Sequence, residues 1–290
     1  MTQKRATPTV KRRRVGAQLR RWREEAAGLK PGEGARAVGW DQPKLSRVER
    51  GVYTVSAEDV RHLAFTYGIS DVAAVDEVAR AAEVPPGTGW WAPYANTISP
   101  AYLDFIELES EADTIRVEHP VVVPGTVQAP GYAREIIARS PQSITAEHAE
   151  KLISIRLARQ EILTRTNKPV KFHALVPESA LHATFASGRG IMRDQLRKLL
   201  DVSELPNTKV QIVPLTAHPT YGSNSSMTIL TFNHPWAPVA SIDNPMGGNH
   251  TEDPEQVRIL EAEFDHIASA ALPVDKSRDL LIEYVERLHK

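Results

Sequence analysis

The segment 39–51, with the sequence GWDQPKLSRVERG, constrains the fold of this chain more than any other stretch. Gly39 can adopt the positive φ that a tight turn between two helices requires. Asp41 can cap a following helix, and Pro43 is tolerated in the first turn of that helix. Gly51 is suited to end it. The segment therefore predicts a turn followed by a short helix.

The predicted helix has two different faces. Leu45 and Val48 are three residues apart, so one face can pack against a core. The other face is polar and basic, and glutamine and arginine are the side chains that read adenine and guanine edges through paired hydrogen bonds. The pattern predicts the second helix of a helix-turn-helix. The candidate DNA-contacting residues on and beside it are Gln42, Pro43, Lys44, Ser46, Arg47, Arg50 and Lys30.

The flanking sequence completes a small helical domain over 15–84. Apolar residues recur at helical spacing on both sides of the segment. A Ser-x-x-Asp sequence that starts at Ser56 is typical of a helix N-terminus. The expected helices are a first one with the apolar residues Val15, Leu19 and Trp22, a short second one that includes 35–38, the predicted recognition helix, a fourth after Ser56, and a fifth over 71–83.

The ending Ser-Arg-Val-Glu-x-Gly at 46–51, together with five short helices, resembles the λ-repressor/Cro type of helix-turn-helix domain, the Xre family. The resemblance implies an ion pair between Glu49 and an arginine of the first helix, for which Arg23 is the candidate.

Two departures from the family pattern affect the first two helices. An apparent extra alanine in 23–28 would rotate Arg23 by about 100°, since an α-helix has 3.6 residues per turn. Pro31 and Gly34 stand where the family usually has glutamine and an apolar residue. We therefore expect the second helix to be short or shifted.

Charge is distributed unevenly along the chain. Residues 1–70 carry fifteen Lys/Arg and seven Asp/Glu, a balance of +8, although the whole chain has a net charge of −1. A basic segment joined to an acidic body is expected when one end of a protein meets a polyanion. The residues 1–14 are expected to form a flexible basic arm that tracks phosphates or enters the minor groove. Its candidate contacts are Arg12, Arg13 and Arg14, and a solvated tail without specific contacts is the open alternative.

Composition excludes several kinds of protein. The chain has no cysteine, so it has no disulfides, thiolate metal sites or thiol-based redox sensing. It contains no apolar run of about 18 residues and no signal-peptide core, so we expect a cytoplasmic protein. Local metal-ligand spacings, a Gly-x-Ser-x-Gly elbow and a P-loop are absent from the sequence. We expect no metal, no cofactor and no enzymatic activity.

The Pro/Gly-rich stretch 85–89 reads as a linker to a larger domain over 90–290. Apolar runs rich in β-branched residues alternate there with helical periodicity. The acids in 107–113 are expected to form a solvated helix face. The fold class is therefore α+β, with an all-α N-terminal helix-turn-helix domain followed by a domain with a small sheet and C-terminal helices. The expected strands are 172–176, 209–213, 227–232 and, more weakly, 239–242, and the expected helices are 102–108, 132–138, 152–162, 192–200, 257–271 and 280–288.

Two polar stretches, 216–226 and 243–251, are expected to be loops that flank a strand hairpin. Glycine-containing polar loops at strand ends often hold ligands or partners. Tyr221, Asn224 and Asn249 are the candidate ligand or partner residues, and surface loops without a ligand are an equally open reading.

Four motifs of the body recur together in one known group of proteins. They are Val-Pro-Gly-x-x-Gln at 123–128, Tyr-Ala-Arg at 132–134, Arg-Leu-Ala-Arg-Gln-Glu-Ile-Leu at 156–163, and Leu-Pro-Asn-x-x-Val-Gln-Ile-Val-Pro at 205–214. Their combination resembles the uncharacterised C-terminal domain of a large actinobacterial regulator family of the WhiJ-like kind. The resemblance implies a cytoplasmic transcription regulator linked to development, often paired with a small acidic protein encoded nearby in an antitoxin-like arrangement.

Two functional hypotheses follow. In the first, a homodimeric repressor places two recognition helices about 34 Å apart on a palindromic double-stranded operator, and its body receives a protein or ligand signal. In the second, the helix-turn-helix is an antitoxin-like protein-binding module, or the body is enzyme-like, and DNA is bound only non-specifically.

Overall fold

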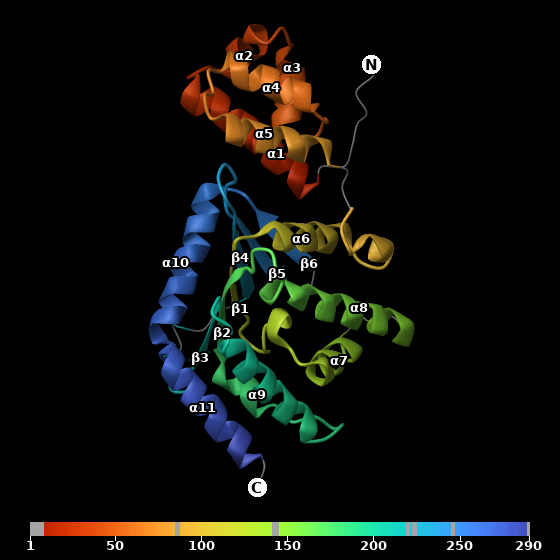
Figure 1. The fold of residues 1–290 in the computed structure, drawn as a ribbon, viewed down its shortest axis with the longest axis vertical. Helices are drawn as coiled ribbons and strands as arrows, with labels where there is room; N and C mark the ends of the chain where they lie inside the picture. The colour runs from red at the N-terminus through yellow and green to blue at the C-terminus, as the bar shows by residue number, and fades with distance from the viewer. Residues whose placement is uncertain are drawn as a thin grey trace. The chain divides into compact units, whose positions relative to one another are not determined.

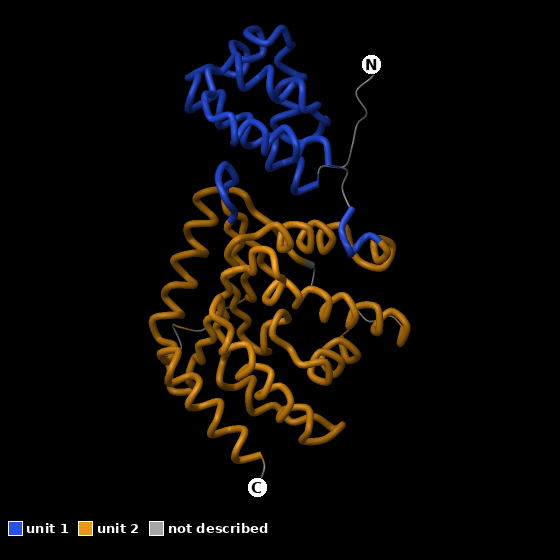
Figure 2. Tube along the Cα trace, in the orientation of Figure 1, with its two compact units in different colours: residues 1–92, 232–237 blue, residues 93–231, 238–290 orange. Residues whose placement is uncertain are grey.

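A computed structural model describes residues 9–84, 88–140, 145–218, 221, 225–244 and 247–288. The chain divides into two compact units, shown in Figure 2. The first contains residues 1–92 and the separate segment Phe232–Ala237, and the second contains residues 93–231 and 238–290. Within the described residues, no helix combines the length and apolar character that a membrane span needs.

The first unit is helical, as the sequence predicts (Figure 1). Its core joins apolar residues of all five α-helices, among them Leu19, Leu45 and Leu63, which are fully buried. Ser56 caps the fourth helix by accepting a hydrogen bond from Asp59 N at 3.0 Å, which confirms the predicted capping sequence. The helices are α1 (Val10–Arg21), α2 (Pro31–Ala37), α3 (Gln42–Glu49), α4 (Ala57–Thr66) and α5 (Val72–Glu83), and a π-helical turn, Trp22–Ala26, extends α1.

One predicted boundary in this unit is wrong. Thr9 caps α1 by accepting a hydrogen bond from Arg12 N at 3.3 Å, so residues 10–14 are helical and do not belong to a flexible arm. The second helix is short, as expected, and contains most of 35–38; it begins at Pro31, because proline suits the first turn of a helix. The rest of the expected arm, residues 1–8, and residues 85–87 of the expected linker lie outside the described residues.

The second unit is built on a six-stranded mixed sheet with the order β3-β2-β1-β4-β5-β6. The first three strands run parallel to one another, and β4, β5 and β6 pair in antiparallel fashion. This confirms the α+β class with a larger sheet than predicted. The strands are β1 (Thr114–Glu118), β2 (Lys171–Pro177), β3 (Thr208–Val213), β4 (Ser226–Thr231), β5 (Val239–Asn244) and β6 (Gly247–Thr251).

Helices cover both faces of this sheet (Figure 1). On one face, Phe264 of α10 packs into a core with Met227, Ile229 and Ala240 of the central strands. On the other, Phe105 of α6 stacks on the ring of His250 with centroids 5.8 Å apart. The helices are α6 (Pro100–Glu111), α7 (Pro130–Ala138), α8 (Ala146–Ala158), α9 (Gly190–Ser203), α10 (Pro254–Ala270) and α11 (Val274–Arg287).

Three expectations for the second unit are corrected. The stretch 107–113 is not a solvated face throughout, because Glu109 is buried and pairs with Arg159 at 2.6 Å. The predicted loop 243–251 contains the strand β6, which pairs with β5. Neither β6 nor β1 was among the predicted strands.

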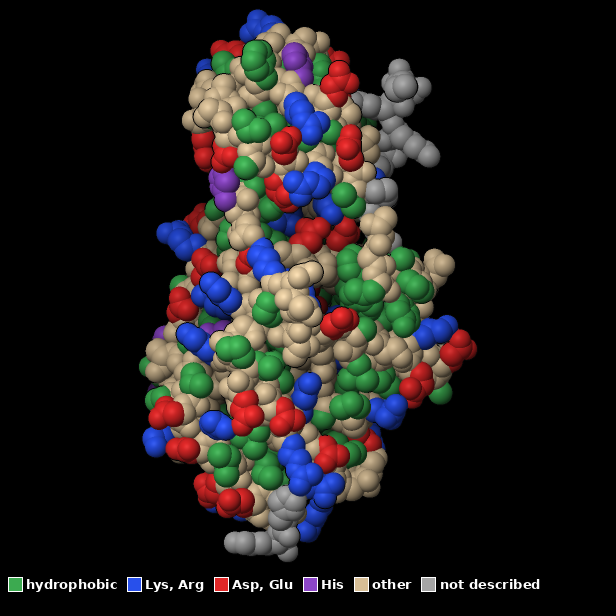
Figure 3. Space-filling model, in the orientation of Figure 1, with side chains coloured by type: hydrophobic (Ala, Val, Ile, Leu, Met, Phe, Trp, Pro, Cys, Tyr) green, Lys and Arg blue, Asp and Glu red, His purple; other side chains and the backbone are tan. Residues whose placement is uncertain are grey.

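On the face of the second unit drawn in Figure 3, acidic and basic side chains are interspersed. The surface visible there has no broad patch of one charge among the described residues. A mixed surface of this kind offers no continuous track for a polyanion.

Candidate nucleic-acid interface

The predicted recognition helix forms as α3, Gln42–Glu49. Asp41 caps it by accepting a hydrogen bond from Lys44 N at 2.6 Å. The glycines on either side, Gly39 and Gly51, have φ of 69° and 68°, the left-handed conformation that glycine adopts without steric cost. The turn and both helix ends therefore follow the local chemistry of the sequence.

The two faces of α3 separate as expected. Leu45 and Val48 are buried in the core of the unit. Gln42, Pro43, Arg47 and Arg50 are exposed, and Lys44 and Ser46 are half-buried. The helix thus presents to solvent the amide and guanidinium groups that can pair with base edges. Their contact with DNA remains a prediction.

Two aromatic side chains hold the basic groups of α3. Lys44 Nζ lies 3.6 Å from the ring centroid of Trp40, close enough for a cation–π contact. Arg47 Nη1 donates a hydrogen bond to Tyr53 Oη at 2.9 Å. These contacts restrict long side chains before any ligand arrives, which reduces the entropy lost on binding. Neither aromatic was among the predicted site residues, although Trp40 directly precedes the capping residue Asp41 and Tyr53 lies two residues after Gly51.

A buried ion pair joins α3 to the end of the first helix. Arg23 Nε and Nη2 donate to the two carboxylate oxygens of Glu49 at 2.7 and 2.9 Å. Arg23 is 1% exposed, and the hydrogen bond to Glu49 raises its pKa above the usual value. The family-implied pair is present, so the expected rotation of Arg23 away from Glu49 is wrong.

A π-helical turn explains how the pair survives the extra alanine. Residues Trp22–Ala26 form this turn, and Ala27 N donates to Trp22 O at 3.1 Å, a bond that spans five residues. One additional residue in a helix can be absorbed by such a turn without rotating the preceding side chains. The departure from the family pattern is therefore local.

Gly34 makes room for the buried arginine. A Cβ at this position would lie 2.4 Å from Arg23 Cδ and 3.1 Å from Tyr67 Oη. The hydroxyl of Tyr67 also donates to Gly34 O at 3.3 Å. The apolar residue that the family usually has here is replaced because the arginine and tyrosine fill that space.

The start of α1 packs closely against the end of α3. A Cβ on Gly16 would lie 2.4 Å from Glu49 O, and one on Gly51 would lie 2.7 Å from Arg13 N. Arg12 and Arg13, both half-buried, are thereby placed beside the C-terminal end of the recognition helix. This arrangement allows a helix, and not a flexible arm, to carry the basic side chains.

Arg14 has a different environment from its neighbours. Its guanidinium carbon lies 3.7 Å from the ring centroid of Phe232 and 4.9 Å from that of Trp236. Trp236 Nε1 also donates to Glu77 Oε1 of α5 at 3.3 Å. Arg14 is 6% exposed, so it presents no exposed guanidinium to DNA, contrary to its place among the candidate contacts. No pattern in the sequence indicates that 232–237 belongs to this unit.

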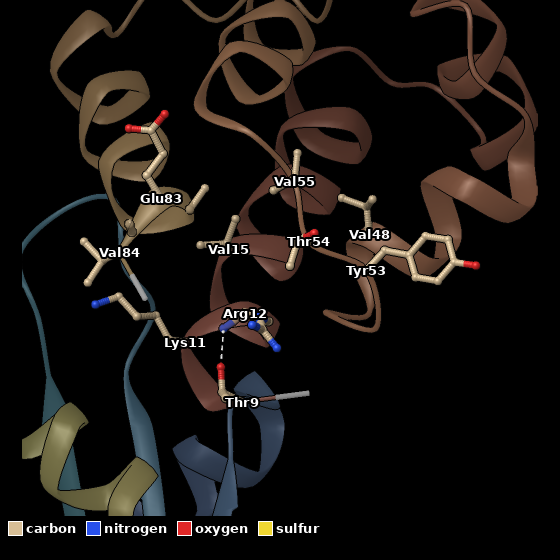
Figure 4. A pocket seen from close by; sticks show the side chains of 12 residues that line it. Thr9, Lys11, Arg12, Val15, Val48, Tyr53, Thr54, Val55, Glu83 and Val84 are labelled. Atoms are coloured by element: carbon tan, nitrogen blue, oxygen red, sulfur yellow. Dashed lines mark hydrogen bonds between the residues drawn. The ribbon is translucent and has the colours of Figure 1, made fainter. Parts of the chain in front are cut away.

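The first unit also contains a pocket of about 250 Å³, shown in Figure 4. Val15, Val48 and Val55 form much of its apolar wall, and Lys11 and Glu83 contribute charged side chains. The pocket is not lined by Gln42, Lys44 or Arg47, so it is separate from the exposed face of α3.

The remaining predicted site residues lie apart from this surface. Lys30 is exposed and precedes α2, where its backbone N donates to Glu33 Oε2 at 2.8 Å. In the second unit, Tyr221 stacks on His266 with centroids 4.5 Å apart. Asn249 is exposed on the edge strand β6, and Asn224 lies outside the described residues. Of the candidates within the described residues, Tyr221 thus lies against α10 and Asn249 on β6.

The five-helix unit with an exposed basic α3 defines a helix-turn-helix protein, and residues 14–80 match a known helix-turn-helix domain. Residues 102–283 match the family described as a domain of unknown function, DUF5753. Because this second match spans more than half of the chain, the protein belongs to the DUF5753 family. No curated protein and no solved structure matches the chain. The helix-turn-helix domain indicates DNA binding and transcriptional regulation.

Proposed function

We propose that the protein is a sequence-specific transcription regulator that binds a palindromic operator as a homodimer and represses its target genes in the cytoplasm. The observation that carries the proposal is the exposed face of α3, where Gln42 and Arg47 stand on a helix fixed by a cap and a buried ion pair. Both residues have the side-chain chemistry for paired hydrogen bonds to base edges.

The dimer is proposed from the geometry of DNA. A single short helix reads only a few base pairs, and two copies one helical turn apart, about 34 Å, double the site. The DUF5753 domain is proposed to receive the signal that changes DNA affinity, as the resemblance to WhiJ-like actinobacterial regulators suggests. A small acidic partner protein encoded nearby is one source of such a signal.

Selection of bound sites from a random DNA library tests the proposal. We expect the wild-type protein to enrich a palindromic sequence. Arg47→Ala is expected to relax preference at one base position in each half-site and to weaken binding by about 1–3 kcal/mol. Arg61→Ala is a matched control, because Arg61 is an exposed arginine of α4 that pairs with Asp76 at 3.1 Å.

The same selection distinguishes the proposed repressor function from the alternative function. Enrichment of no sequence, or an unchanged preference in Arg47→Ala, would favour an antitoxin-like protein-binding module or an enzyme-like body with non-specific DNA affinity.

A further inference from the structure

The second unit contains a polar cavity of about 240 Å³. Its walls come from α6, from α8, from the segment that follows β1, and from the hairpin of β5 and β6. This volume is below the roughly 300–1,000 Å³ of pockets that hold drug-sized ligands. The cavity is therefore suited to a smaller molecule.

One face of the sheet supplies a row of polar side chains to this cavity. Strand register aligns Thr228 of β4 with Ser241 of β5, and Ser241 with His250 of β6. All three residues line the cavity or lie beside it, whereas Met227 and Ala240 belong to the apolar core on the opposite face. A polar row inside a folded unit requires hydrogen-bonding partners.

Arg156 of α8 provides an unsatisfied donor. Its Nη1 donates to Gln128 Oε1 at 3.1 Å, but its Nε is buried and has no hydrogen-bond partner. No carboxylate among the described residues lies within ion-pair distance of Arg156, in contrast to Arg159, which is held by Glu109 through two bonds of 2.6 and 2.7 Å. Burial lowers the pKa of Arg156 and the charge of Arg159 acts in the same direction, whereas Tyr102 and the more distant carboxylate of Asp243 partly oppose the shift. A carboxylate from a ligand would supply the missing counter-charge.

His250 provides an unsatisfied acceptor. Its Nε2 lies 2.8 Å from Ala101 O, which fixes the proton of the neutral ring on Nε2. Its Nδ1 is therefore an acceptor, and this atom is buried without a hydrogen-bond partner. The buried hydroxyl of Ser241 also lacks a hydrogen-bond partner. A ligand that donates hydrogen bonds would satisfy both groups.

The backbone of Gly248 lies close against these groups, and Asp243 occupies the space that a side chain at this position would take. A Cβ on Gly248 would lie 2.9 Å from Asp243 Oδ1, 3.6 Å from His250 Cε1 and 3.8 Å from Ser241 Oγ. A carboxylate and two neutral polar groups thus surround one small volume. This end of the cavity is matched to a cationic donor.

We propose that the cavity binds a zwitterion of the size of a free amino acid, with its carboxylate on Arg156 and its ammonium group between Asp243, Ser241 and His250. A purely anionic ligand would face the carboxylates of Asp243 and Glu118, which both contribute to the lining. A purely cationic ligand would face the guanidinium of Arg156. The role of this ligand as the input signal of a transcription regulator rests on the proposed function. Its binding to the cavity requires no DNA.

The test is thermal shift followed by calorimetry on the full chain without DNA, with each standard L-amino acid at millimolar concentration as probe. We expect at least one to raise the melting temperature and to bind saturably. Propionate and propylamine, which carry one charge each, serve as controls and are expected to leave the melting temperature unchanged. Absence of any amino-acid effect, or equal effects of the single-charge controls, would overturn the proposal.

Two variants test whether the amino acid binds in this cavity. Arg156→Gln is expected to weaken binding by at least about tenfold, because it removes the lining guanidinium that is not held by a protein carboxylate, in contrast to Arg159. Gly248→Ala adds a methyl group beside Asp243, Ser241 and His250, where the ammonium group of the ligand is proposed to lie. Gly248 does not have a positive φ that would strain alanine there. Arg134→Gln is the control, since Arg134 is exposed and pairs with Glu150 at 3.4 Å.

Wild-type affinity in Gly248→Ala would place the amino acid elsewhere and refute the assignment, even if Arg156→Gln fails to fold. Failure of the DNA-binding test would refute the proposed regulator function without affecting the measurement of amino-acid binding, because the two measurements are independent.

Discussion

Arg23 and Glu49 show how single residues hold the reading helix in place. Their side chains are 1% and 7% exposed, and one guanidinium satisfies both carboxylate oxygens. Removal of one partner of such a pair leaves an uncompensated charge in the interior. The pair therefore connects α3, the predicted recognition helix, to the core of its unit.

We predict that Glu49→Gln lowers the free energy of unfolding of the first unit by about 3–5 kcal/mol. Native-state hydrogen exchange of its amides is the measurement. The control is Arg20→Gln, which breaks an exposed pair with Glu24 at 2.9 Å and should cost at most about 1 kcal/mol. Equal losses in the two variants would show that the buried pair has no special role.

The glycines of α2 give a second prediction at this scale. Gly34→Ala would force a methyl group against Arg23 and should destabilise the unit by about 1–3 kcal/mol. Gly32→Ala in the same helix meets only Gln42 Oε1 at 3.4 Å, and should stabilise it by up to about 1 kcal/mol. Urea unfolding of the two variants checks the opposite signs, and a loss of stability in both would contradict the packing argument.

Two half-buried histidines of the second unit predict its response to pH. Burial lowers the pKa of His119 and of His173 below the unfolded value near 6.5. The unfolded chain therefore binds more protons as pH falls, so stability present above about pH 6.5 is lost as pH falls toward the lowered pKa values.

We expect urea midpoints measured from about pH 7.5 to about pH 5.5 to decrease. His173→Asn should flatten this decrease, since asparagine does not titrate. An unchanged slope in the variant would show that His173 contributes nothing to the pH dependence.

At the scale of elements, local sequence patterns were sufficient to predict the bounds of a helix where the residues that begin and end it are characteristic. The cap at Asp41, the glycines at both ends and the apolar pair Leu45 and Val48 predicted α3 within a residue. The strand β1 was missed because Arg116 and Glu118 make it look like a continuation of the acidic helix. The presence of an arginine at position 116 of a strand is explained by the fold, because Arg116 pairs with Glu261 of α10 at 2.5 Å.

Long-range packing accounts for the other misses. The π-helical turn, the role of Gly34 and the placement of 232–237 all depend on contacts between residues distant in sequence. The polar cavity likewise requires sheet register, which brings Ser241 and His250 together. Single-sequence periodicity contains no information about such neighbours.

The cap of α3 yields a prediction at the element scale. Asp41→Ala should cost about 0.5–2 kcal/mol, because the amide of Lys44 loses its acceptor. Asp41→Asn should retain most of the stability, since asparagine caps helices equally well. Thermal unfolding followed by circular dichroism distinguishes the variants, and equal behaviour would show that the cap does not stabilise the helix.

At the scale of the whole molecule, the change from basic to acidic sequence coincides with the division into two compact units. The basic balance of +8 over residues 1–70 falls almost entirely within the helix-turn-helix unit, and the remaining residues are acidic. Neutralisation of phosphates by Lys and Arg makes affinity fall with salt, with a slope of about −0.9 for each phosphate contacted. We therefore expect the salt dependence of DNA binding to come from the first unit.

The most direct test is fluorescence anisotropy of the full chain with DNA from the neighbourhood of its own gene, titrated against salt with random DNA as competitor. We predict at least about a thousandfold preference for one site over random DNA. The same preference should fall sharply in Arg47→Ala. Binding to that DNA no tighter than to random DNA would contradict sequence-specific regulation and would reduce the basic unit to a non-specific tether.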